Sequence, residues 1–179
     1  MASKRRKLLI IDGYNVLRSG NRYKLIAGPD YTDDTFNQAR ERLINDTVSY
    51  AGHDRGAIIV FDGAKNRFST GETEVIGGVR IMFSPAGQSA DKIIEKLAHD
   101  ARERNVETLV VTSDATIQDT VFGGGVDRMS ANDFCWEIAA LHEENANDAK
   151  PHIARKNTVG DRIDPEIRKK LEALRDRSR

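Results

Sequence analysis

Four aspartates lie at or just beyond segments that the sequence predicts to be buried strands. Asp12, Asp62 and Asp114 each follow an apolar run, and Asp91 lies in the first turn of a predicted helix that follows another. In an open parallel sheet, ligands bind beyond the carboxyl ends of the strands, so the four carboxylates can converge on one crevice. Carboxylates at such close range repel one another unless protons or a cation neutralise them.

This pattern of carboxylates indicates a metal-dependent hydrolytic site. An all-oxygen ligand set suits a hard ion such as Mg²⁺ or Mn²⁺. Such an ion can orient a water molecule, lower its pKa and stabilise charge on a phosphoryl oxygen, which is the chemistry of phosphodiester hydrolysis. The alternative is that aspartate often follows strands because it caps helices and turns. Neither G-x-S-x-G nor H-E-x-x-H occurs, and the four histidines are scattered without zinc spacing.

Three polar neighbours could support these carboxylates. Asn15 lies three residues beyond Asp12 and can hydrogen-bond its carboxylate or a bound water, and Ser113 directly precedes Asp114. Ser89 is expected to cap the helix that carries Asp91. For Asn15 and Ser113, a role as a helix N-cap is the alternative interpretation. The glycines at 123–125 are predicted to end a helix, and a close approach of the backbone to phosphate is the alternative. They do not match a Walker A loop, which needs a following Lys and then Ser or Thr.

The elements that must position these residues alternate along the chain. Apolar runs predict strands at residues 7–11, 57–61, 75–76, 79–83, 109–111 and 126–129. Helical periodicity predicts helices at 14–19, 32–51, 89–101, 115–122 and 130–141, with a loop at 20–31. This order predicts an α/β domain whose central sheet is mostly parallel, with helices on both sides.

Composition and charge narrow the class of protein. Of 179 residues, 39% are hydrophobic and 31% charged, which is typical of a soluble globular chain. No apolar run is long enough to cross a bilayer, and Asp12 interrupts the only signal-peptide-like segment after four apolar residues. We therefore expect a cytoplasmic protein without a membrane partner. The single cysteine, Cys135, is predicted to be a core residue.

The charge is unevenly distributed along the chain. Residues 150–179 carry ten Lys or Arg and five Asp or Glu, a net charge of +5, so the remainder carries −5. Residues 145–164 are predicted to be a linker and 165–177 a charged helix. We divide the chain into a domain at 1–148 and a basic linker and C-terminal helix at 149–179. This tail could contact nucleic-acid phosphates, solubilise the protein or lie on its acidic body.

Five short motifs resemble those of YacP-like NYN-domain proteins, a branch of the PIN-like nucleases. The first is IIDGYNVL at residues 10–17, and the second is VFD at 60–62. SADKIIE at 89–95 and VTSD at 111–114 with Gln118 follow, and FGGG at 122–125 with RMSA at 128–131 closes the series. The motifs occur in the family's order over about residues 7–142.

The resemblance implies a PIN-like three-layer α/β/α fold and a metal-dependent endoribonuclease. By position, Asp12, Asp91 and Asp114 would form the acidic core with Mg²⁺ or Mn²⁺, Asn15 would be its polar partner, and Asp62 is a further candidate ligand. The family includes an enzyme that acts on messenger RNA associated with the ribosome, so RNA and the ribosome are the implied partners. The chain departs from the pattern at Asp119, which is interpreted as a helix-surface residue.

Basic and aromatic residues near the expected sheet edge are candidates for RNA contacts. They are Lys65, Arg67, Lys92 and Arg128, with Arg22 and Lys24 in the 20–31 segment and Tyr14 or Phe68 to stack on a base. Solvated charges, and packing of Tyr14, are the alternatives.

Two other functions remain open at this point. One is a non-catalytic RNA- or ribosome-binding module that has kept the fold. The other is a phosphotransfer or receiver-like domain with a phosphorylated aspartate. A dehalogenase-type site of this second kind needs an aspartate two residues after the first, and Tyr14 occupies that position.

Overall fold

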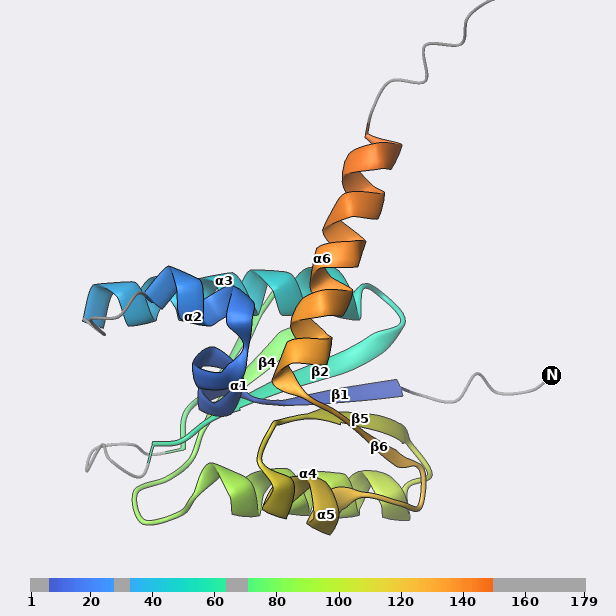
Figure 1. The fold of residues 1–179 in the computed structure, drawn as a ribbon. Coiled ribbons are helices and arrows are strands. Elements are labelled where there is room, and N and C mark those ends of the chain that lie inside the picture. The colour runs from blue at the N-terminus through green and yellow to red at the C-terminus, as the bar shows by residue number, and fades with distance from the viewer. Residues whose placement is uncertain (1–6, 28–32, 64–70, 150–179) are drawn as a thin grey trace, which may run out of the picture. The chain divides into compact units, whose positions relative to one another are not determined.

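A six-stranded sheet forms the centre of the computed structural model, which describes residues 7–27, 33–63 and 71–149 (Figure 1). The strands are β1 (Lys7–Asp12), β2 (Arg55–Phe61), β3 (Thr73–Ile76), β4 (Val79–Phe83), β5 (Glu107–Val111) and β6 (Val126–Met129). Their order across the sheet is β3-β4-β2-β1-β5-β6. All neighbouring pairs are parallel except β3 and β4, which pair antiparallel. The prediction of a mostly parallel sheet is confirmed.

Helices cover both faces of this sheet. They are α1 (Gly13–Ser19), α2 (Asn21–Ala27), α3 (Asp33–Ala51), α4 (Ala90–Glu103), α5 (Ala115–Val121) and α6 (Ala131–Asp148). Helices α4 and α5 lie together on one face, whereas α1, α2, α3 and the first half of α6 pack on the other (Figure 1). This is the expected three-layer α/β/α arrangement.

The apolar run of β1 explains why both faces must be covered. Leu9 and Ile11 are fully buried in a cluster with Leu43 and Phe134 from the α3 and α6 side, whereas Ile10 is fully buried in a second cluster with α4 and α5. Successive side chains of a strand point to opposite faces of the sheet. A continuous apolar run therefore requires a helical layer on each face.

Within the segment 20–31, which the sequence predicts to be a loop, the described residues 20–27 differ from that prediction. Residues 21–27 form helix α2, and its Tyr23 side chain is fully buried. Gly20 allows the close approach that this packing needs, because an added Cβ would lie 2.9 Å from the Cys135 sulfur and 2.7 Å from the Val16 carbonyl oxygen. The glycine that indicated a loop instead joins two packed helices.

A buried carboxylate also anchors α2. Asp46 on α3 is 2% exposed and accepts hydrogen bonds from the Arg22 Nε at 2.7 Å and from the Tyr23 hydroxyl at 3.1 Å. Its other oxygen lies 3.0 Å from the His142 Nε2 on α6. Although burial disfavours its charge, the hydrogen bonds from Arg22 and His142 hold the pKa of Asp46 below its usual value. The guanidinium of Arg22, a candidate for RNA contact, therefore forms a salt bridge with Asp46 inside the domain.

Helix α6 is longer than the sequence predicts. The periodic apolar positions end near Leu141, yet the helix continues to Asp148 through residues that are nearly all exposed. Its buried residues, among them Phe134, Cys135 and Ile138, all lie in the first half of the helix. The chain divides into two units, Met1–Glu144 and Asn145–Arg179. The predicted basic tail and its helix lie outside the described residues.

Two expectations from composition can be compared with the structure. Cys135 is 6% exposed within the core on the α6 side, as predicted. Within residues 7–27, 33–63 and 71–149, no helix combines the length and apolar character needed to traverse a membrane.

Replacing Gly13 with alanine should destabilise the domain. The added Cβ would lie 2.4 Å from Cε1 of Phe61, whose ring is fully buried and stacked on Phe83, so it has no room to move. We expect a loss of about 1–3 kcal/mol in the free energy of unfolding, as for other overpacked cores, measured by denaturant titration. The matched control is Gly56→Ala, whose Cβ would make an ordinary 3.6 Å contact with Leu8. An unchanged midpoint for Gly13→Ala would contradict this packing.

Candidate active site

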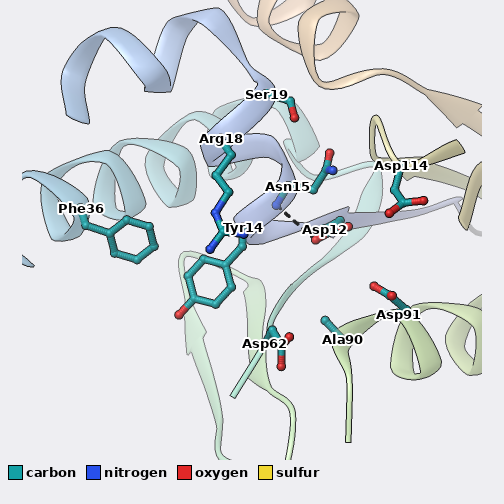
Figure 2. Close-up of a pocket in the computed structure, with 10 residues that line it drawn as sticks. All are labelled: Asp12, Tyr14, Asn15, Arg18, Ser19, Phe36, Asp62, Ala90, Asp91 and Asp114. Atoms are coloured by element: carbon teal, nitrogen blue, oxygen red, sulfur yellow. Dashed lines mark hydrogen bonds between the residues drawn. The ribbon is translucent and has the colours of Figure 1, made fainter. Parts of the chain in front are cut away.

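A pocket of about 440 Å³ opens where the carboxyl ends of the central strands meet the starts of the helices that follow them (Figure 2). All four aspartates singled out in the sequence contribute to it. Its lining residues are Asp12, Tyr14, Asn15, Arg18, Ser19, Phe36, Asp62, Ala90, Asp91 and Asp114. The strand order thus gathers side chains from positions more than one hundred residues apart.

Asp12 is the most deeply buried of these carboxylates. It is 7% exposed, ends β1 and is the N-cap of α1. Its oxygens accept hydrogen bonds from the Asn15 backbone N–H at 3.3 Å and the Thr112 hydroxyl at 3.1 Å. Burial raises the pKa of Asp12 to about 6 against the opposing effect of the two hydrogen bonds, and the charges of Asp91 and Asp114 add smaller contributions in the same direction as burial. Asp12 is therefore a carboxylate that favours neutralisation by a proton or a cation.

Asp91 and Asp114 approach the pocket from two helix starts. Burial first, then the charges of Asp114 and Asp62, raise the pKa of Asp91, which lies in the first turn of α4. Asp114 is the N-cap of α5 and accepts from the backbone N–H groups of Thr116 at 2.8 Å and Ile117 at 3.4 Å. Helix capping and pocket lining are thus compatible for Asp114, as they are for Asp12.

Asp62 is held at the edge of the pocket by a buried serine. The Ser84 hydroxyl donates to Asp62 at 3.2 Å and accepts from the Gly63 backbone N–H at 2.8 Å. Ser84 is fully buried just beyond β4, next to β2 in the sheet. The adjacent ends of two parallel strands therefore fix the position of Asp62.

Thr112 connects the two carboxylates at the ends of β1 and β5. Its hydroxyl donates to Asp12 and accepts from the Asp114 backbone N–H at 3.1 Å. The neighbouring Ser113 donates its backbone N–H to the Asn15 side-chain oxygen at 2.7 Å, and its hydroxyl accepts from the Ala131 backbone N–H at 3.0 Å. The Ser113 hydroxyl thus holds the start of α6, while its backbone orients Asn15.

Several of these positions were not singled out in the sequence. Thr112 enters the sequence analysis only as part of the VTSD motif, which assigns it no role, and Ser84 carries no signal. Arg18 and Ser19 could have been found, because they lie three and four residues after Asn15 and therefore on the same face of α1. Phe36 lies within the helix predicted at residues 32–51, where it is one apolar residue of the helical pattern, and it also lines the pocket.

Three other predicted site residues, Ser89, Lys92 and Arg128, are not among the residues that line the pocket. Ser89 occupies the N-cap position of α4 but its side chain makes no capping hydrogen bond, and Lys92 is exposed on the first turn. Arg128 donates to Asp119 at 2.8 Å, and its guanidinium lies 5.0 Å from the centre of the Phe122 ring. Asp119 is an exposed surface residue, as expected. Lys65, Arg67 and Phe68 lie outside the described residues.

The donor set of the pocket fits a hard divalent cation in its chemistry. Four carboxylates and the side-chain amide of Asn15 line it, and no histidine or cysteine does so among the described residues. The raised pKa values of Asp12 and Asp91 show that their negative charges are under-compensated, which a cation would correct. Among the residues that the structure describes, no three acidic, histidine or cysteine side chains already meet at a single ion-sized point. The carboxylates instead line the pocket from separate elements (Figure 2).

A mostly parallel α/β/α domain with aspartates gathered at the carboxyl edge of its sheet defines the class as PIN-like. The chain belongs to the YacP-like NYN domain family, whose model matches residues 9–176. This match extends well beyond the motifs at residues 7–142 and includes most of the basic tail. The family is part of the PIN-like nuclease superfamily, which generally uses divalent metal ions.

Relatives from Bacillus subtilis support this assignment. The chain is 28% identical over 134 residues to a protein named uncharacterized protein YacP of strain 168, covering 75% of this chain and 76% of that one. It also resembles two crystal structures of Rae1 (YacP). One of them, the structure of a mutant, has a TM-score of 0.63 at 27% identity, covering 94% of this chain and 99% of the other. The second structure has a TM-score of 0.65 at 26% identity, covering 94% of each chain.

Replacing Asp12 with asparagine should stabilise the domain above pH 6. The folded state raises the pKa of Asp12 from 3.8 to about 6, so the ionised carboxylate opposes folding by about 3 kcal/mol once the pH exceeds both values. The gain of Asp12→Asn over the wild type should be absent below pH 4, grow between pH 4 and 6, and then level off. Denaturant titrations in EDTA measure it, with the exposed Asp119→Asn as control. A variant that is less stable than the wild type at pH 7.5 would refute this account.

Proposed function

We propose that the protein is a metal-dependent endoribonuclease that hydrolyses RNA phosphodiester bonds. One observation carries the proposal: Asp12, Asp91 and Asp114, from three distant segments, line one pocket, in which burial and the neighbouring carboxylates raise the pKa of Asp12 and of Asp91. Such an arrangement lowers stability and needs a functional reason. Membership in a family of PIN-like nucleases supplies the class of reaction.

The carboxylates of Asp12, Asp91 and Asp114, with Asp62 as a fourth, would hold one or two Mg²⁺ or Mn²⁺ ions. An ion bound there would act as a Lewis acid on the phosphoryl oxygen and lower the pKa of an attacking water. The chain's own residues position these ligands: Thr112 orients Asp12, and Ser84 orients Asp62. The Asn15 side-chain oxygen is held by Ser113, so its amide N–H groups are the donors that can orient water or a phosphate oxygen.

The partner of this site is RNA, by its family. We further propose messenger RNA as the substrate, the ribosome as the context in which it is presented and the cytoplasm as the compartment. The names of the relatives do not state a substrate, so these finer assignments rest on the resemblance of the motifs. Among the basic residues predicted to contact RNA, Lys92 on the first turn of α4 is nearest in sequence to a pocket carboxylate, one residue after Asp91.

The main rival is a non-catalytic RNA- or ribosome-binding module. A module freed from catalysis has no need to keep Asp12 buried beside two other carboxylates, because any neutral side chain there would remove the repulsion. The phosphotransfer alternative is disfavoured by Tyr14, whose ring packs 5.3 Å from the ring of Phe36 and 5.2 Å from that of Phe61, centre to centre. That position therefore has a structural role in place of the second aspartate.

Purified protein should cleave RNA in Mg²⁺ or Mn²⁺ and not in EDTA. Asp91→Asn should lower the rate by about a hundredfold or more, as expected when one charge-stabilising group is removed from a preorganised site. Gel assays on a structured RNA and a messenger-like RNA, with and without ribosomes, measure this. The matched control is Asp100→Asn, which alters a carboxylate at the other end of α4. Cleavage that continues in EDTA, or survives both Asp12→Asn and Asp91→Asn, would sink the mechanism.

Ion binding can be separated from cleavage in the same samples. Mn²⁺ should raise the thermal unfolding midpoint of the wild type and of Asp100→Asn, because a ligand bound only by the folded state stabilises it. The same titration should have a much smaller effect on Asp91→Asn. RNA binding without a Mn²⁺-dependent shift and without cleavage on ribosomes would favour the non-catalytic module.

A further inference from the structure

The pocket has a second wall that the proposed hydrolysis does not use. Opposite the carboxylates, Tyr14 and Arg18 of α1 and Phe36 of α3 line the same cavity (Figure 2). The cavity volume of about 440 Å³ lies within the range of about 300–1,000 Å³ typical of small-molecule sites. It therefore has room for more than a cation and a phosphate.

The aromatic side chains of this wall pack against rings of the hydrophobic core. The Tyr14 ring meets the Phe61 ring edge-on at 5.2 Å, and Phe61 in turn stacks on Phe83 at 5.5 Å. Phe36 lies 5.3 Å from Tyr14 with its ring tilted by 36°, and it is only partly buried. Because Phe61 is fully buried, the two outer rings rest on a fixed base and still line the cavity.

Arg18 brings positive charge to the same wall. The Arg18 guanidinium lies 5.8 Å from the centre of the Tyr14 ring, and its residue is exposed. Burial raises the pKa of the Tyr14 hydroxyl, while the charges of Arg40 and Arg18 act in the opposite direction. Within the described part of the chain, no carboxylate forms an ion pair with either arginine.

We propose that this wall is a subsite for one unpaired nucleotide of the RNA, with its base stacked on Phe36 and Tyr14 and its phosphate bound by Arg18. The assignment rests on the proposed function and names the side chains that would hold an unpaired nucleotide opposite the carboxylates. Base–aromatic stacking does not depend on sequence, because every base has a π-face. The subsite therefore selects unpaired strands and not a particular base.

A duplex cannot place a phosphate at the carboxylates and stack a base on Phe36 and Tyr14 at the same time. In an A-form helix the bases are paired and stacked inside, so a protein reaches mainly the minor-groove edges, the 2′-hydroxyls and the phosphates. The Asp12 carboxylate is 7% exposed at the end of β1, so the reacting phosphate must enter the pocket to reach it. An unpaired nucleotide can enter with its base turned toward Phe36.

Binding of a short fluorescein-labelled RNA, single-stranded or annealed to its complement, tests the subsite. Fluorescence anisotropy in EDTA separates binding from cleavage. The wild type should prefer the single strand, and Phe36→Leu should weaken that binding by about fivefold or more, the loss expected for one base–aromatic stack. Arg18→Gln should make the slope of log K against log salt shallower by about 0.7, the value for one phosphate contact on a single strand.

Matched controls isolate the pocket from general effects. Trp136→Leu removes an aromatic side chain that is 80% exposed on α6, and Arg104→Gln removes an exposed cation at the far end of α4 from Asp91. Both should bind the single strand with wild-type affinity, and Arg104→Gln should keep the wild-type salt slope. Thermal melting shows whether Phe36→Leu remains folded, and the exposed Arg18→Gln tests the wall without altering the core.

The inference is overturned if the duplex binds as tightly as the single strand, if Phe36→Leu and Arg18→Gln bind like the wild type, or if the wild type binds neither RNA. Cleavage assays in Mn²⁺ distinguish this failure from failure of the proposed function. If the wild type cleaves RNA and both variants bind it like the wild type, the subsite is refuted and the proposed nuclease function is not. If binding depends on Phe36 and Arg18 but no cleavage occurs, the proposed nuclease function is refuted and the subsite is not.

Discussion

The burial of the Asp12 carboxylate beside two other negative charges is the constraint on which the site depends. A charged group removed from water is unfavourable unless hydrogen bonds or opposite charge compensate for it. Here the Thr112 hydroxyl and the Asn15 backbone N–H supply part of that compensation, and the pKa of Asp12 still rises to about 6. The apolar residues that cover both faces of β1 must stabilise the domain enough to tolerate this local cost.

Parallel strand pairing turns this constraint into a three-dimensional site. Because β1 pairs with β5 on one side and β2 on the other, the segments after these strands meet at one edge of the sheet. Short side chains then connect them: Thr112 joins Asp12 to the Asp114 backbone, and Ser84 joins Asp62 to the end of β4. Hydrogen bonds between strand ends therefore help to position Asp12, Asp62 and the backbone of Asp114.

The two helical layers make different contributions to the pocket. Helices α4 and α5 bring Asp91 and Asp114, whereas α1 and α3 bring Asn15, the aromatic rings and Arg18. Helix α2, which follows α1, is held against α3 and α6 by the buried Asp46 of α3, which binds Arg22 of α2 and His142 of α6. A side chain far from the reacting groups, such as Asp46, thus helps to keep the aromatic wall in its place.

The sequence by itself determined the order of the elements, the mostly parallel sheet and the four aspartates, because strand periodicity and strand-end residues are local signals. It did not reveal helix α2 or the end of α6, since the packing of Tyr23 and the Asp46 network come from residues distant in the chain. Only the tertiary structure showed that Thr112 and Ser84 orient carboxylates and that Phe36 faces them across a cavity. Those roles depend on which strand ends become neighbours, and strand order arises from long-range pairing that no short motif encodes.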